Sequence, residues 1–167
     1  MAGPGASNTN LVESWNGASW TEIAETNSSL YLRGGTGNAP ATSTMLFGGG
    51  YPRSANTEIW NGSSWTEVNN LNTIRADLGG GGDSVSSAIG FGGRSGDGVQ
   101  VLTEAWNGTS WTEVADQANG GGFYFADSGG SGSALKIAGA NDANNPAHTN
   151  LTEEWTQALG TVSFDID

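Results

Sequence analysis

The octapeptide "WNGSSWTE" at residues 60–67 is the most informative stretch of this chain, because the chain repeats it almost unchanged. The pattern appears again as "WNGASWTE" at 15–22 and as "WNGTSWTE" at 106–113. Asn-Gly between two β-rich segments is a strong hairpin signal, since both residues tolerate the positive φ angles of a type I′ turn. We therefore expect a hairpin turn at each octapeptide; a two-residue turn and a four-residue loop both place its two tryptophans on one face.

The repeat extends beyond the octapeptide. The first tryptophan of each unit recurs at intervals of 45, 46 and 49 residues. Each unit contains four short strand candidates, and the glycine-rich "LGGGGDS" at 78–84 is expected to be a tightly packed inner strand. Because the tryptophans recur in every unit, we interpret them as packing elements rather than as exposed rings that stack on sugars. They are Trp15, Trp20, Trp60, Trp65, Trp106, Trp111 and Trp155.

Composition restricts the partners of the chain. Its 167 residues include only five lysines and arginines against 17 acidic residues, which gives a net charge of −12. A nucleic-acid backbone or an anionic membrane surface would be repelled, so we expect no nucleic-acid partner. No apolar run approaches the roughly 18 residues of a membrane span, so we expect no membrane insertion. The absence of cysteine excludes disulfides and thiolate metal sites.

The units resemble the repeats of kelch-type β-propellers. A Gly-Gly doublet closes the second strand, an acidic-aromatic third strand follows, and "WTEV" forms the fourth. The matching segments are "LFGGG" (46–50), "GFGG" (90–93), "TEIW" (57–60) and "TEAW" (103–106). The resemblance implies an all-β, kelch-like β-propeller of four-stranded antiparallel blades. The phrases "WNGTSWTE" and "TEEW" (152–155) also resemble repeats in structural proteins of marine bacteriophages.

Several positions depart from the kelch pattern. The usual third-strand tyrosine is a tryptophan here. The arginine expected after the fourth strand is matched only by Arg75, since Leu30 and Gly121 hold the equivalent positions. In the last unit the glycine doublet becomes "IAGA" (137–140) and "WNG" becomes "WTQ" (155–157), as is common in terminal repeats.

The units amount to about three and a half blades, whereas closed propellers have about four to eight. We therefore expect a homo-oligomer, a dimer or a larger assembly, in which copies cover each other's exposed faces; a longer propeller containing this segment is the alternative. A ring and a filament both remain open as the form of the assembly.

We divide the chain into a flexible N-terminal segment (1–10) and kelch-like repeats (11–167). The repeats comprise a half-blade (11–24) and units of about 25–69, 70–115 and 116–167. In the last unit, "TVSFDID" (161–167) is a candidate last strand.

Length variation is concentrated in the loops between the second and third strands. From the second glycine of the doublet to the next tryptophan the spacing grows from 11 to 13 to 16 residues. Variable loops of a repeat scaffold often carry binding residues, so a surface glycan or receptor is the candidate ligand, and tolerated drift in loop length is the alternative. The candidate ligand-binding residues are Tyr51, Arg53, Arg94, Asp97, Asp142 and His148.

Patterns typical of catalysis are weak, so we expect no catalytic residue, no metal site and no cofactor. The single histidine, His148, excludes a two-histidine metal site, and no motif marks a serine nucleophile for it. Glutamates such as Glu58, Glu104 and Glu67 recur in every unit, whereas a catalytic pair is needed once. We interpret them as charges that keep blade edges soluble.

These features favour a non-catalytic, self-assembling structural β-propeller protein, either a phage virion component (tail, fibre or decoration) or an extracellular filament component. The alternative is a glycan- or receptor-binding propeller module, a lectin-like adhesin that uses the variable loops. A hydrolase with Asp83 and Asp127 as inner-strand acids is the weakest hypothesis. The start of the chain has no signal-peptide pattern, so we expect cytoplasmic synthesis and a final location in a virion or outside the cell.

Overall fold

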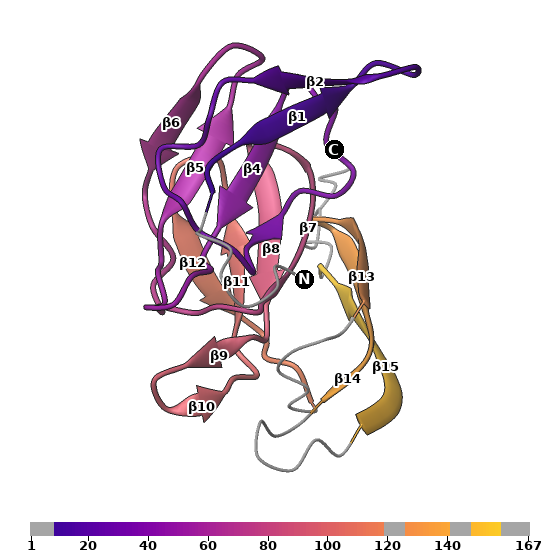
Figure 1. The fold of residues 1–167 in the computed structure, drawn as a ribbon. Helices are drawn as coiled ribbons and strands as arrows, with labels where there is room; N and C mark the ends of the chain where they lie inside the picture. The colour runs from indigo at the N-terminus through magenta and orange to yellow at the C-terminus, as the bar shows by residue number, and fades with distance from the viewer. Residues whose placement is uncertain (1–8, 119–125, 141–147, 158–167) are drawn as a thin grey trace, which may run out of the picture.

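The computed structural model describes residues 9–118, 126–140 and 148–157. These residues form fifteen strands and no helix, which confirms the all-β prediction. The strands pair only in antiparallel fashion, in small separate sheets (Figure 1). Most of the segment 1–10 and the candidate last strand 161–167 lie outside the described residues.

The N-terminal half of the chain forms two sheets. The hairpin sheet pairs β1 (Val12–Trp15) with β2 (Trp20–Ile23). The first four-stranded sheet follows, with the order β3-β4-β5-β6. Its strands are β3 (Gly34–Gly35), β4 (Thr44–Phe47), β5 (Thr57–Trp60) and β6 (Trp65–Val68).

The rest of the chain repeats this plan. The second four-stranded sheet has the order β7-β8-β11-β12, and the three-stranded sheet has the order β13-β14-β15. In the part of the chain that the structure describes, these sheets do not close into a ring. The strands are β7 (Gly79–Ser84), β8 (Ser87–Phe91), the small hairpin β9 (Arg94–Ser95) and β10 (Gly98–Val99), β11 (Thr103–Trp106), β12 (Trp111–Val114), β13 (Ala126–Gly130), β14 (Ser133–Ala140) and β15 (His148–Thr156).

The repeated octapeptide is a hairpin whose loop has four residues. Trp60 pairs directly with Trp65, so the loop runs from Asn61 to Ser64. Asn61 Oδ1 accepts hydrogen bonds from the backbone N–H groups of residues 63 and 64, both at 2.9 Å, and Gly62 has a φ of +93°. Of the two loop lengths that the sequence left open, the four-residue loop is formed, because the asparagine caps the loop with its side chain instead of adopting a positive φ. The two indole rings share one face, with centroids 5.4 Å apart.

A tryptophan pair is buried between the two four-stranded sheets. Met45 and Phe47 of β4 pack in one hydrophobic cluster with Trp106 and Trp111 of the next sheet. Phe47 and Trp111 meet edge to face with centroids 4.8 Å apart, and the indole N–H of Trp111 donates to Thr57 Oγ1 at 3.0 Å. This contact combines apolar burial with a satisfied indole donor, which is the usual arrangement of a buried tryptophan.

The innermost strands β3, β7 and β13 lie side by side, with β7 between the other two. A Cβ atom on Gly80 would stand 2.5 Å from the carbonyl oxygen of Gly35, and one on Gly81 would stand 2.9 Å from that of Gly129. Neighbouring backbones approach too closely here for any side chain. The stretch "LGGGGDS" is thus a tightly packed strand, and its glycines let three sheets meet along one line.

The third-strand glutamates are buried rather than placed at sheet edges. Glu58 and Glu104 are 0% and 1% exposed. Arg33 Nη1 lies 3.1 Å from Glu58 Oε1, and Arg75 Nη2 lies 2.7 Å from Glu104 Oε1. Interpreting these two glutamates as soluble edge charges is therefore wrong, because β5 and β11 lie inside their sheets and a buried carboxylate needs a cation. Arg33 thus pairs with the buried glutamate of its sheet as Arg75 does, although the sequence offers Leu30 at the equivalent position.

Candidate functional site

Aromatic and basic side chains gather beside the loop that follows β4. The phenol of Tyr51 donates a hydrogen bond to Asp77 Oδ2 at 2.9 Å. The ring of Tyr31 lies 5.9 Å from that of Tyr51, and the Arg53 guanidinium lies 4.9 Å from the centroid of the Tyr51 ring. We call Tyr31, Tyr51, Arg53, Asp77 and Arg94 the tyrosine cluster.

Backbone conformation builds this cluster. Asp77 and Leu32 occupy equivalent positions after the preceding fourth strand, and both have positive φ angles, 58° and 57°. The backbone N–H of Asp77 donates to the carbonyl of Leu32 at 3.0 Å. Arg94 is held next to them because its backbone exchanges two hydrogen bonds with Ala76. Aspartate visits this left-handed region more readily than leucine, so strain is concentrated at Leu32.

The surroundings of Tyr51 change its acidity. Burial of the phenol raises the pKa of Tyr51 above its ordinary value of 10.0, and the hydrogen bond and charge of Asp77 act in the same direction. Arg94 and Arg53 act in the opposite direction, because positive charge stabilises a phenolate. The cluster therefore presents aromatic rings, a phenol and guanidinium groups together, which suits a sugar ring or an acidic group of a glycan.

The two cluster arginines are unusual in this acidic chain. Three of the five basic residues lie beside third-strand glutamates in successive sheets. They are Arg33, Arg75 and Lys136, beside Glu58, Glu104 and Glu153. Burial lowers the pKa of Lys136, and the charge of Glu153 opposes that shift. Arg53 and Arg94 are the remaining two, and both lie in the tyrosine cluster.

The predicted ligand residues do not all meet. The structure brings Tyr51, Arg53 and Arg94 together, and it leaves Asp97 in the turn between β9 and β10, where its backbone N–H donates to a serine hydroxyl. Asp142 lies outside the described residues. The last of the predicted residues, His148, begins β15 and pairs with Ala140, but its side chain is not among the described ones.

Two members of the cluster were not predicted from the sequence. Tyr31 and Asp77 come from the segments before the inner strands, not from the variable loops. The one available signal was that Asp77 and Leu32 share a spacing of 12 residues from the preceding fourth-strand tryptophan. That spacing does not show that the loop after β4, which carries Tyr51, folds against Asp77.

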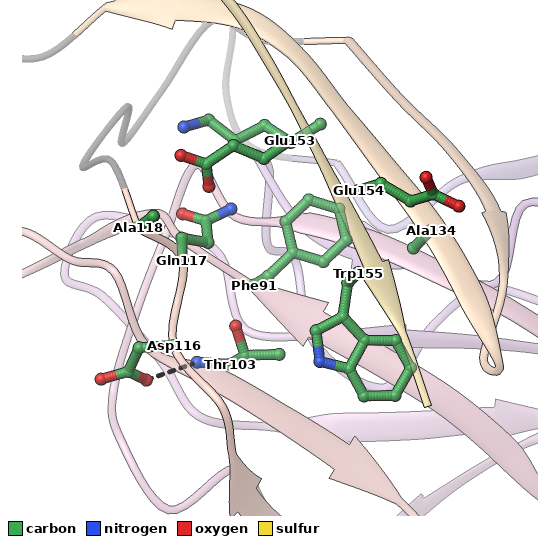
Figure 2. A pocket seen from close by; sticks show the side chains of 10 residues that line it. Phe91, Thr103, Asp116, Gln117, Ala118, Ala134, Glu153, Glu154 and Trp155 are labelled. Atoms are coloured by element: carbon green, nitrogen blue, oxygen red, sulfur yellow. Dashed lines mark hydrogen bonds between the residues drawn. The ribbon is translucent and has the colours of Figure 1, made fainter. Parts of the chain in front are cut away.

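A second candidate site is a cavity of about 280 Å³ between the second four-stranded sheet and the three-stranded sheet (Figure 2). The rings of Phe91 and Trp155 line it, together with the polar groups of Thr103, Gln117 and Glu153. Three buried oxygens, Thr103 Oγ1, Gln117 Oε1 and Glu153 Oε1, have no hydrogen-bond partner within the described part of the chain. Buried acceptors of this kind favour the binding of a group with an N–H or O–H donor.

The neighbouring interface indicates which group fits this cavity. There the ring of Trp111 contacts Phe47, the hydroxyl of Thr57 and the ring of Trp106. By register, the equivalents of these three residues are Phe91, Thr103 and Trp155. All three line the cavity. Its wall therefore repeats the residues that surround the Trp111 indole, with the Thr103 hydroxyl at the place of the Thr57 hydroxyl.

The two ends of the stack of sheets expose apolar side chains. Trp15 and Trp20 of the hairpin sheet are 49% and 63% exposed, whereas the equivalent tryptophans of both four-stranded sheets are buried. Their rings still form a pair, with centroids 5.5 Å apart. At the other end, Leu135 and Ile137 of β14 are 38% and 40% exposed. A packing motif is thus intact in the first sheet but has no cover among the described residues.

Two comparisons of the sequence with known proteins find no relative. A scan against protein-family models gives no match, and a search of curated proteins gives none either. Within the described ranges, no group of three or more His, Asp or Glu side chains could hold a metal ion. The described residues likewise include no helix that could span a membrane.

Proposed function

We propose that this chain is a non-catalytic, self-assembling structural protein, a kelch-like β-propeller of about three and a half blades that further copies complete. The observation that carries the proposal is the exposure of the Trp15–Trp20 pair. The equivalent tryptophan pairs, Trp60–Trp65 and Trp106–Trp111, are buried in the two four-stranded sheets. A chain that retains a packing motif on an open face is suited to cover that face with another molecule.

The arrangement of the sheets supports propeller-like blades. Successive sheets repeat the same strand order and register, and their innermost strands lie side by side. Hydrophobic clusters lie between sheets that follow one another in the chain. Blades packed face to face about a common axis have these properties.

Burial of the exposed tryptophans provides the driving force. Full burial of a large apolar side chain is worth about 1.5 to 3 kcal/mol. Association also costs several kcal/mol in lost translational and rotational freedom, so one tryptophan would not suffice. The tryptophan pair and the apolar side chains at the other end together bury more apolar surface than a single tryptophan does.

The resemblance of "WNGTSWTE" and "TEEW" to bacteriophage repeats supports a virion component, in a tail, a fibre or a decoration layer. An extracellular filament would rest on the same self-association. Both settings use repeated contacts between identical subunits, and neither needs catalytic residues.

Sedimentation velocity of the wild-type protein and of a Trp15→Ser, Trp20→Ser double variant tests this proposal. We expect concentration-dependent oligomers of the wild type and a folded monomer of the variant. Tyr31→Ser is the control, because it removes an exposed aromatic residue from the tyrosine cluster and should leave association intact. A wild type that sediments as a monomer at every concentration would overturn the proposal.

A glycan- or receptor-binding module is the second candidate function. It is favoured by the convergence of Tyr51, Arg53 and Arg94 in one cluster of a chain with a net charge of −12. Glycan-array binding by the wild type, lost in Tyr51→Ala and Arg94→Ala, would support it. The absence of binding, or binding unchanged in both variants, would exclude this role for the cluster.

A further inference from the structure

We infer that the exposed face of the three-stranded sheet in one copy is the docking surface for the Trp15–Trp20 face of a second copy. The inference rests on the proposed function and names the contact through which copies associate. The stack of sheets would then continue from one copy into the next, with the C-terminal end of one meeting the N-terminal end of the other.

The contact between the two four-stranded sheets is the template for this docking. The face of β4 and β5 with Met45, Phe47 and Thr57 receives Trp106 and Trp111 of the following sheet. Phe47 pairs in register with Thr57, which places the ring and the hydroxyl next to each other under the indole of Trp111. An apolar residue beside a threonine on adjacent strands is thus the receiving half of the contact.

The three-stranded sheet presents the same receiving half to the outside. Ile137 of β14 pairs in register with Thr152 of β15, as Phe47 pairs with Thr57. Side chains alternate along β14, so Ala134 and Lys136 line the cavity toward the second four-stranded sheet while Leu135 and Ile137 face the other way. Leu135 corresponds to Met45 by position. The receiving face is therefore present and uncovered in the described structure.

The hairpin sheet presents the inserting half. Trp15 pairs in register with Trp20, as Trp106 pairs with Trp111. On the other face of this hairpin Val12, Ser14 and Ile23 are partly buried. Just after β2, the carbonyl of Ala24 accepts the indole N–H of Trp65 from the following sheet at 3.1 Å. Among the described residues, the tryptophan face is thus turned away from the following sheet. In the docked pair, Trp20 Nε1–H would donate to Thr152 Oγ1, as Trp111 donates to Thr57.

The two halves differ, so the contact is heterologous. Each copy carries one receiving face and one inserting face, and docking leaves one of each free at the ends of a pair. Copies therefore add head to tail, and they close into a ring if the rotation per copy allows it, or grow into a filament otherwise. A symmetric contact between two tryptophan faces would instead stop at a dimer.

Carboxylates modulate the contact. Glu154 pairs in register with Leu135, at the position that Ile59 holds in β5, and Glu13 and Glu22 lie on the inserting face. These negative charges oppose one another when the faces meet, and salt screens such repulsion. Association should therefore strengthen with ionic strength.

Two variants that each block one face test the inference. Trp20→Asp removes the inserting half, and Ile137→Asp removes the receiving half. Both side chains are exposed, so we expect the fold to survive each substitution, and circular dichroism checks this. We expect each variant alone to be a monomer by light scattering. An equimolar mixture should form a species of twice the chain mass containing one copy of each, because the remaining faces are complementary. Trp20→Ser and Ile137→Ser repeat the test with smaller perturbations.

The outcomes separate this inference from the proposed function. If Ile137→Asp alone associates as strongly as the wild type, or if the mixture stays monomeric while the wild type associates, the head-to-tail contact is wrong and self-assembly stands. If the wild type itself never associates, both are wrong. A one-to-one pair that forms only in the mixture supports both.

Discussion

Thr57 and Thr103 occupy equivalent places in two sheets but have different partners. Thr57 Oγ1 accepts the indole N–H of Trp111, whereas Thr103 Oγ1 is buried in the cavity wall without a partner among the described residues. We predict opposite effects of one substitution. Thr57→Val should lower the free energy of unfolding by about 1 to 3 kcal/mol, because it leaves the indole donor unsatisfied, and Thr103→Val should raise it by up to about 1 kcal/mol.

Urea unfolding of the two variants measures the difference, and each serves as the control of the other. If Thr103→Val destabilised the protein as much as Thr57→Val, a donor must reach the Thr103 hydroxyl, and our description of the cavity would be wrong.

The buried ion pairs are the second feature at the residue scale. Glu104 accepts hydrogen bonds from Arg75 Nη2 at 2.7 Å and from the backbone N–H of Asn72 at 2.7 Å. Replacing Glu104 by Gln leaves the buried Arg75 charge without its counterion, so the free energy of unfolding should fall by about 3 to 5 kcal/mol. Glu113→Gln, an exposed glutamate of the neighbouring strand, should change it by less than about 0.5 kcal/mol. Equal effects of the two substitutions in denaturant unfolding would contradict this account.

Tyr51 gives a pH-dependent prediction. Its pKa lies above 10.0 in the folded protein, chiefly because of burial and then because of Asp77. Between pH 10.0 and the folded pKa, the folded state holds a proton that the unfolded chain has released, so the free energy of unfolding falls as pH rises through that window. Asp77→Asn should lower the pKa of Tyr51, because it removes a negative charge.

The ultraviolet titration of the wild type minus that of Tyr51→Phe isolates this phenol from the other tyrosines. A wild-type midpoint at or below 10.0, or a midpoint unaffected by Asp77→Asn, would show that the contact between Tyr51 and Asp77 is wrongly described.

The tryptophan pairs could be predicted from the sequence, whereas the cations that neutralise the buried glutamates could not. Arg33, Arg75 and Lys136 reach their glutamates from different points of the unit, two from loops and one from the adjacent strand. No fixed spacing marks such a charge pair, because only proximity in the folded chain matters. The tyrosine cluster was missed in part for the same reason.

At the scale of elements, the inner strands depend on glycine. A Cβ at Gly80 would collide with the backbone of Gly35, which cannot move without separating β7 from β3. Gly80→Ala should therefore lower the free energy of unfolding by about 3 kcal/mol or more. Gly37→Ala is the matched control, because nothing lies within 4 Å of its Cβ position and its φ is not positive. A thermal-unfolding midpoint for Gly80→Ala equal to that of the control would refute the close approach of the strands.

The four strands of each repeat unit were predictable from turn chemistry and repeat period, whereas the small hairpin of β9 and β10 was not. The length of the loop in the repeated octapeptide was not predictable, because Asn-Gly serves two loop geometries. Here the Asn61 side chain accepts two backbone N–H groups and fixes the longer one. The burial of each tryptophan pair could not be predicted either, since it depends on the sheet that lies opposite.

At the scale of the molecule, the charge of −12 opposes association and the exposed apolar ends favour it. Repulsion between exposed charges is screened within about 10 Å at 0.1 M salt, whereas apolar burial is strengthened rather than screened by sulfate and similar salts. We therefore predict that the average mass of the wild type rises with both protein concentration and ionic strength.

The absolute mass of the wild-type protein by light scattering, over a concentration series at low and at raised salt, tests self-assembly most directly. We predict masses above the 17.0 kDa of one chain that increase with concentration and are larger at raised salt. A mass of one chain under every condition would contradict the account, because the Trp15–Trp20 face would then remain open in solution.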